Sequence, residues 1–251
     1  MRGLVVPFHV GDPVDGLETP AGCEAVRPAL PPGTPQERMV VLFETLAARV
    51  AEDAIRLVYA GDCMAPLGVL AGLERRGLSP SIVWFDAHGD FNTWETTPSG
   101  YIGGMPMAMM VGLGEQSIVQ GIGLGQIEPR RIVLAGARDI DTQEGAALAT
   151  SGIQISSVED APDAVPDDGS SIHVHLDVDV VTPGEMPGLR FPAAGGPSLG
   201  AVERALRSLA ASGRVACVTV ACTWDPARGR AGEAVAATER LVAAILPTAG
   251  S

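Results

Sequence analysis

Short apolar segments alternate with longer amphipathic segments along most of the chain. The apolar segments are rich in β-branched residues and are predicted strands, at 3–8, 55–60, 81–85, 131–136, 172–180 and 215–222. Between most of them the pattern predicts helices, at 35–53, 65–76, 198–212 and 231–246. Near-continuously apolar strands that alternate with helices are typical of a parallel sheet covered by helices on both faces.

The remaining pattern predicts one domain over residues 1–251, with loops at 12–32 and 161–171 that are rich in Pro and Gly. No repeat or interdomain linker interrupts the sequence. The 46% hydrophobic content excludes disorder, and no apolar run is long enough for a membrane span. The first residues become polar too soon for a signal peptide, so a cytoplasmic location is expected.

The net charge and the cysteine spacing argue against some classes of partner and of motif. The net charge is −13, from 30 acidic and 17 basic residues, all of them arginine. An acidic chain without a basic stripe argues against nucleic acid and favours cations in an interior site. The four cysteines form no C-x-x-C pair, so a zinc ribbon or thioredoxin motif is not predicted and free thiols are expected.

Polar residues gather where the predicted strands end, and in such sheets ligands bind beyond the carboxyl ends of the strands. Asp86, His88 and Asp90 follow strand 81–85 at every second position. In extended chain this spacing puts three side chains on one side, so they are predicted to converge. Taken alone, the motif is also consistent with a polar loop.

A second group supports a metal site. His173, His175, Asp177 and Asp179 alternate along the predicted strand 172–180 and share one face. Burial of unpaired carboxylates costs several kcal/mol each, and a metal ion is the simplest compensation. The combined donors favour Mn²⁺, then Fe²⁺ or Co²⁺, with Zn²⁺ possible. Their number fits two ions roughly 3.5 Å apart.

These motifs carry a family resemblance. D-A-H-G-D after an apolar strand, followed later by D-V-D, resembles the signature of arginase-type ureohydrolases over nearly the whole chain. The resemblance implies a three-layer α/β/α sandwich with a mainly parallel sheet of about eight strands. It also implies a binuclear Mn²⁺ centre and hydrolysis of the guanidino group of an arginine-like amino acid. Metal-bound hydroxide would attack, releasing urea or hydroxyurea.

The resemblance assigns roles residue by residue. It implies as metal ligands Cys63, Asp86, His88, Asp90, Asp177 and Asp179. Asp90 would also act in catalysis by holding the hydroxide and relaying its proton. For the amino-acid end of the substrate it implies Asn92 and Ser99 at the α-carboxylate, and Asp141 and Glu144 at the α-amino group. Taken alone, the R-D-I-D segment before Glu144 is also typical of a surface charge cluster.

Three positions depart from the family pattern. Cys63 stands in place of a histidine ligand, as in the hydroxyarginine hydrolase of D-cycloserine biosynthesis. A thiolate suits Mn²⁺ poorly, so one ion is expected to bind weakly, unless Cys63 is only a core thiol. Gly103 replaces a proton-shuttle histidine, and His175 is the nearby catalytic candidate or a hydrogen-bond partner of a ligand. Thr223, or Asp225 beside it, replaces a guanidinium-binding glutamate.

The absent glutamate leaves room for an N-hydroxyguanidine, which is less basic than a guanidine. Two alternatives stay open. The substrate could be another guanidino-type compound, namely agmatine, guanidinobutyrate or formiminoglutamate. The chain could instead be a catalytically weakened metal-binding member of the family. The expected partner is a small guanidino amino acid, with no nucleic acid or membrane, and a homo-oligomer remains possible.

Overall fold

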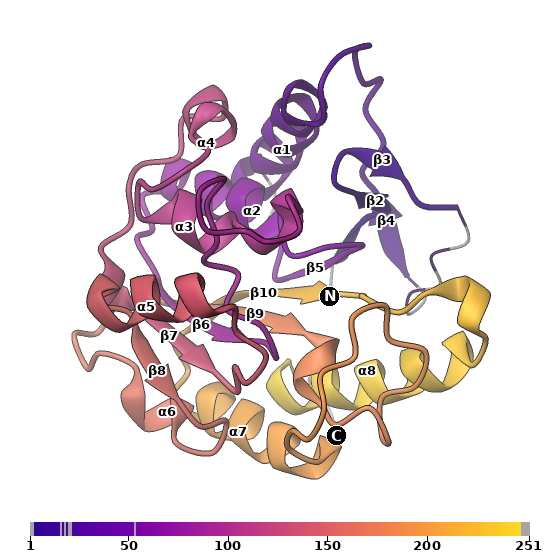
Figure 1. Cartoon of the computed structure of the whole chain (residues 1–251), viewed down its shortest axis with the longest axis vertical. Helices are drawn as coiled ribbons and strands as arrows, with labels where there is room; N and C mark the ends of the chain where they lie inside the picture. The colour runs from indigo at the N-terminus through magenta and orange to yellow at the C-terminus, as the bar shows by residue number, and fades with distance from the viewer. Residues whose placement is uncertain (1–2, 16, 18, 20–21, 53, 247–251) are drawn as a thin grey trace.

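One parallel sheet of eight strands organises the computed structural model, which describes residues 3–15, 17, 19, 22–52 and 54–246 (Figure 1). Every strand pair in this sheet is parallel. In spatial order the strands are β4 (Cys23–Ala25), β1 (Gly3–Val6), β5 (Leu57–Ala60), β10 (Val215–Ala221), β9 (Ile172–Asp177), β6 (Ser81–Phe85), β7 (Ile132–Ala135) and β8 (Gln154–Ser156).

Helices cover both faces of the sheet, as the apolar strands require. Figure 1 shows α1 (Pro35–Glu52) and α2 (Ala65–Arg75) on one side, and α7 (Leu199–Ala211) and α8 (Ala231–Ile245) on the other. Strand side chains alternate between two cores: Trp84 belongs to the first and Phe85 to the second. The predicted three-layer α/β/α fold is therefore confirmed.

Short elements complete the fold. The hairpin strands β2 (Phe8–His9) and β3 (Asp12–Pro13) pair outside the main sheet. The short helices are α3 (Pro106–Met110), α4 (Ser117–Gly121), α5 (Thr142–Ser151) and α6 (Ala161–Ala164). No helix in the described part of the chain is long and apolar enough to cross a membrane.

The six predicted strands and four predicted helices are present, with differences in detail. The predicted strand 3–8 divides into β1, which ends at Val6, and β2, which begins at Phe8. The predicted strand 172–180 ends at Asp177, and Val178–Val180 forms a 3-10 helix. The predicted loop 12–32 contains β3 and β4, and the predicted loop 161–171 begins with α6. β4 and β8 are only three residues long and mostly exposed, so neither has a clear apolar signal. Asp53 and Pro247, at predicted helix ends, lie outside the described residues.

The strand order places the candidate residues together. β5, β10, β9 and β6 are neighbours at the centre of the sheet. Cys63 and Thr223 follow β5 and β10, Asp177 ends β9, and Asp86 follows β6. Because parallel strands end at the same edge, these four side chains meet there although they are far apart in sequence.

Close packing of α1 on α2 depends on a glycine and gives a stability test. A β-carbon at Gly72 would lie 2.6 Å from the Val50 β-carbon and 2.7 Å from the Ala47 carbonyl oxygen. We expect Gly72→Ala to lower the free energy of unfolding by about 1–3 kcal/mol, because the helices must separate. Gly232→Ala, in α8 and with open space around it, is the control and should change stability by less than about 1 kcal/mol. Equal denaturation midpoints for the two variants would contradict this account.

Candidate metal centre and substrate pocket

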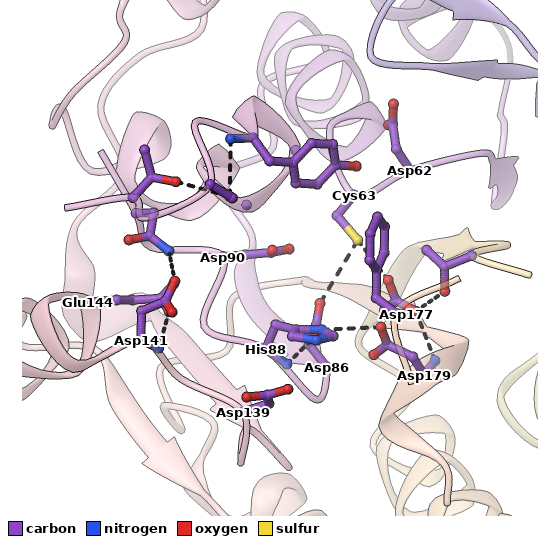
Figure 2. Close-up of a pocket in the computed structure, with 18 of the residues that line it drawn as sticks. Asp62, Cys63, Asp86, His88, Asp90, Asp139, Asp141, Glu144, Asp177 and Asp179 are labelled. Carbon is purple, nitrogen blue, oxygen red and sulfur yellow. Dashed lines mark hydrogen bonds and ion pairs between the residues drawn. The ribbon is translucent and has the colours of Figure 1, made fainter. Parts of the chain in front are cut away.

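A cavity of about 340 Å³ opens at the carboxyl ends of the central strands. Figure 2 shows the labelled side chains converging on it, among them Cys63, Asp86 and Asp179. All the predicted site residues line it except His175: Cys63, Asp86, His88, Asp90, Asn92, Ser99, Asp141, Glu144, Asp177, Asp179 and Thr223.

The turn after β6 brings Asp86, His88 and Asp90 together. The Asp86 carboxylate accepts a hydrogen bond from the His88 backbone N–H at 2.7 Å, so the chain turns as soon as the strand ends. Asp90 lies in the left-handed region, with φ of 48°. The expectation of extended chain through Asp90 is therefore wrong, although all three side chains reach the cavity. A local turn, rather than strand alternation, produces the convergence.

The turn after β9 works in the same way. Asp177 Oδ1 accepts from the Asp179 backbone N–H at 2.8 Å and from the Thr223 hydroxyl at 2.6 Å. The expectation that Asp177 and Asp179 share a strand face is wrong, because Asp179 lies in the 3-10 helix. Asp179 Oδ1 accepts from the Ala87 N–H at 3.2 Å, which ties the two turns to each other.

Four buried carboxylates crowd this end of the cavity. Burial, followed by the charge of Asp179, raises the pKa of Asp177 to about 7, and burial with the charge of Asp86 raises the pKa of Asp179 to about 6. Burial and the Asp86 charge raise the pKa of Asp90 well above its usual value. Removal from water and mutual repulsion disfavour all the negative charges, so a cation here would stabilise them.

His88 lies between two of these carboxylates. Its Nδ1 is 3.3 Å from Asp86 Oδ1 and 3.2 Å from Asp179 Oδ2. Burial alone would lower the pKa of His88, but hydrogen bonds and charge from Asp179 and Asp86 raise it to about 12. An imidazole held by two carboxylates is suited to act as a metal ligand, because a bound divalent ion would replace its proton.

The donor atoms fit metal ions in two overlapping groups. One is Asp86, His88 and Asp179, and the other is Cys63, Asp86 and His175; within each, the ligand atoms lie within 4.8 Å of one another. Asp90 Oδ2 is buried without a hydrogen-bond partner in the described part of the chain. Buried oxygen, nitrogen and sulfur donors with unmet bonding capacity are suited to divalent cations.

Cys63 lies among the carboxylates and not only in the apolar core. Its Sγ is 2.9 Å from Asp177 Oδ2 and 3.9 Å from Asp86 Oδ2. Burial and the charges of Asp177, Asp90 and Asp86 raise the pKa of the Cys63 thiol, so it carries its proton unless a cation displaces it.

Asp141 and Glu144 begin helix α5 as a capping box at the other end of the cavity. Glu144 also accepts from the Phe91 backbone N–H at 2.8 Å, and Asn92 Nδ2 donates to Asp141 Oδ2 at 3.1 Å. Ser99 is exposed at the rim, where its Oγ accepts from the Tyr101 N–H at 3.2 Å. The R-D-I-D segment thus lies at the cavity: Asp139 and Asp141 line it.

Arg138 of the same segment has a structural role. Its guanidinium donates to the carbonyl oxygens of Asp179 at 3.1 Å, Val180 at 3.0 Å and Ala194 at 3.1 Å. These bonds hold the loop after β9 against the turn after β7. The position of Asp179 therefore depends on a side chain that does not line the cavity.

Tyr101 was not singled out from the sequence, and it occupies the space beside Gly103. A β-carbon at Gly103 would overlap the Tyr101 phenol ring. The Tyr101 hydroxyl is 3.1 Å from His9 Nε2, and His9 Nδ1 is 3.1 Å from the Gly61 carbonyl oxygen. His9 and Tyr101 are separated by 92 residues, so no local motif could have indicated this pair.

His175 and Asp225 do not line the cavity. His175 lies below it within β9, fully buried, with its ring centroid 3.9 Å from that of Trp84. Burial and the neighbouring His173 lower the pKa of His175 well below its usual value, so it is a neutral imidazole and a poor proton donor. Asp225 instead pairs with Arg228 at 3.7 Å.

Comparison with known proteins identifies the family of this chain. The sequence profile of the Arginase family matches residues 18–247. The chain belongs to the arginase family. It is similar to the arginase of Bacillus subtilis (strain 168), at 35% identity over 163 residues, covering 59% of this chain and 54% of that protein. It is also similar to the N(omega)-hydroxy-L-arginine amidinohydrolase of Streptomyces lavendulae, at 31% identity over 157 residues, covering 61% and 55%.

The alignments with these curated arginase-family proteins span only about half of their length. The structural match is more extensive. The crystal structure of arginase from Bacillus subtilis superposes with a TM-score of 0.84 and 26% identity, covering 99% of both chains. The arginase of Bacillus caldovelox gives a TM-score of 0.85 at 23% identity, covering 100% of this chain and 99% of that one. The arginase-like fold thus covers nearly the whole chain, including residues 18–247 that the family profile matches.

Asp177 contacts both Cys63 and Thr223 and gives the most direct test of metal binding. We expect Asp177→Ala to lose tightly bound Mn²⁺ and activity together, because a carboxylate between two ions would serve both. Metal analysis after dialysis against Mn²⁺ measures the bound stoichiometry. Asp225→Asn, close in sequence and outside the cavity, is the control. Unchanged stoichiometry in Asp177→Ala would contradict a binuclear centre.

Proposed function

We propose that this arginase-family protein is a metal-dependent hydrolase of the guanidino or N-hydroxyguanidino group of an arginine-like amino acid. Hydrolysis of the C–N bond would release urea or hydroxyurea and an amine. The observation that carries the proposal is that one cavity joins Cys63, Asp86, His88 and Asp179 of the candidate metal groups to side chains suited to an amino-acid end. Its volume, about 340 Å³, is in the range of small-ligand sites.

The metal end would use Asp86, His88, Asp90, Asp177 and Asp179 as the main ligands of one or two divalent ions, with Mn²⁺ expected from the oxygen-rich donors. When bound, such ions lower the pKa of a water and make it a nucleophile near neutral pH. Asp90 Oδ2 is buried and has no hydrogen-bond partner among the residues that the structure describes, so it would accept a proton from a water in the cavity.

The opposite end would bind the substrate's backbone groups. Asn92 and Ser99 offer hydrogen-bond donors for a carboxylate, and Asp141 and Glu144 offer acceptors for an ammonium group. Asn92, Asp141 and Glu144 are already fixed by hydrogen bonds to one another and to the backbone. This end is therefore preorganised, which lowers the entropic cost of orienting a substrate.

Thr223 favours the hydroxylated substrate. Its hydroxyl donates to Asp177 and supplies no negative charge for a guanidinium. An N-hydroxyguanidine is less basic and carries an extra hydroxyl that can hydrogen-bond. The relative named N(omega)-hydroxy-L-arginine amidinohydrolase supports this choice.

The amine leaving group needs a proton, and we assign the donor to the pair of Tyr101 and His9. Burial and the charges of Asp62, Cys63 and Asp90 raise the pKa of Tyr101, so its hydroxyl stays protonated at the cavity. As the C–N bond breaks, the leaving nitrogen takes the phenol proton. The phenol oxygen then takes back a proton that comes from solvent through the His9 imidazole, whose Nε2 lies 3.1 Å away.

The proposal treats residues 1–251 as one catalytic unit in the cytoplasm. The four cysteines are free thiols, which is consistent with a reducing compartment.

A substrate panel tests the assigned amino-acid end. We expect L-arginine-like acids, hydroxylated or not, to be hydrolysed in preference to agmatine, because agmatine lacks the carboxylate that Asn92 and Ser99 would bind. The measurement is kcat/KM for each compound with saturating Mn²⁺, including guanidinobutyrate and formiminoglutamate. Equal or faster turnover of agmatine would contradict the assignment.

Tyr101→Phe tests the proton donor. We expect kcat to fall by about 10²-fold or more with little change in KM, because the variant keeps the ring and loses only the proton. In the profile of rate against pH, the limb that reports ionisation of the proton donor should disappear. Tyr59→Phe, at the only other tyrosine and in the core, is the matched control. Unchanged kcat and pH profile in Tyr101→Phe would exclude the pair as donor.

A further inference from the structure

The His175 imidazole lies in a position that packing alone does not explain. It is fully buried, and neither ring nitrogen has a hydrogen-bond partner among the residues that the structure describes. An unpaired buried polar group is costly, so such groups generally have a partner. The contrast is His173, two residues earlier in β9, whose Nε2 lies 3.1 Å from the Thr219 hydroxyl.

The atoms nearest to His175 are metal-ligand types. A ring nitrogen of His175, Cys63 Sγ and an Asp86 oxygen lie within 4.8 Å of one another. Asp177 Oδ2 is 2.9 Å from the same sulfur. The strand order explains the arrangement, because β9 pairs with β6 on one side and β10 on the other, and β5 follows β10. Thus a thiol and two carboxylates that line the floor of the cavity lie above a buried imidazole.

The donor set around His175 differs chemically from the donor set around His88. Asp86, His88 and Asp179 supply carboxylates and one imidazole, which suit Mn²⁺. The set formed by Cys63, His175, Asp86 and Asp177 adds a thiolate and a second imidazole, which suit Zn²⁺, Co²⁺ or Fe²⁺. A tetrahedral Zn²⁺ places sulfur and nitrogen ligands about 3.6 Å apart. The ligand atoms of Cys63, His175 and Asp86 lie within 4.8 Å of one another, so side-chain shifts of about an ångström would bring them to that separation.

We infer that His175 and Cys63 form, with Asp86 and Asp177, a second metal site that selects a thiophilic ion, so that the centre holds two chemically different metals. Asp86 and Asp177 would be shared between this site and the Mn²⁺ site. His175 would supply the imidazole that Cys63 does not. The inference rests on the proposed function for the presence of metal at this edge, and it adds the identity of one ion and one of its ligands.

Cobalt titration of metal-stripped protein tests the site without an activity assay. We expect wild type to bind Co²⁺ with a thiolate-to-cobalt charge-transfer band, and to keep Zn²⁺ in preference to Mn²⁺ at this site. Cys63→Ser should lose the band, and His175→Asn should weaken Co²⁺ and Zn²⁺ binding by at least about 100-fold, the upper end of what loss of a partner outside the ligand set costs. Asp179→Asn should retain the band and lose Mn²⁺.

Two variants serve as matched controls. His173→Asn alters a buried histidine on the same strand, and Cys217→Ser alters a buried cysteine of β10. Both should bind Co²⁺ as wild type does. If His175→Asn does not fold, as judged by circular dichroism, Cys63→His in the otherwise unchanged chain replaces it. This variant should lose the band and shift the preference from Zn²⁺ toward Mn²⁺.

The results separate this inference from the proposed function. Unchanged affinity and spectrum in His175→Asn, or unchanged metal preference in Cys63→His, would overturn the inference. Turnover of an arginine-like acid by a wild-type protein that shows no thiolate band would overturn it as well, while the proposed function would stand. A thiolate band lost in Cys63→Ser, together with no turnover of any compound in the panel, would support the site and overturn the proposed function.

Discussion

Four buried carboxylates at the ends of neighbouring strands are the constraint on which this structure depends. Asp86, Asp90, Asp177 and Asp179 are each at most 6% exposed, and their raised pKa values reflect burial and repulsion. A fold can retain such a cluster only if hydrogen bonds and positive charge offset its cost. Backbone N–H groups of the two turns, the Thr223 hydroxyl and His88 offset part of it. The remaining cost explains why a site with these residues is suited to divalent ions.

Much of the fold could be predicted from the sequence, because buried parallel strands have a strong apolar signal. Segments such as 81–85 and 215–222 are apolar on both faces, and both became central strands. The edge strands β4 and β8 are short and exposed, so their sequences do not differ from loops. Helix α5 was missed because its buried surface is small: only Glu144 and Leu148 are buried.

The candidate site could also be located from sequence, but its geometry could not. Polar residues after apolar strands indicated the correct edge of the sheet, whereas the expected strand alternation did not produce the convergence. Side chains that accept from their own backbone turned the chain at Asp86 and Asp177. The contact of Tyr101 with His9 depends on the β2–β3 hairpin, and sequence patterns contain no information on such distant pairing.

At the proposed amino-acid end of the cavity, substrate recognition and folding would depend on the same atoms. Asp141 and Glu144 begin helix α5, and Glu144 also fixes the backbone at Phe91. Mutations that alter recognition there would also weaken the helix, so selection on substrate range would meet a stability threshold. Ser99 lies on an exposed loop and does not begin a helix, so its substitution should not weaken one. New specificities in this lineage should therefore arise first at the rim, where sequence can change at little cost to folding.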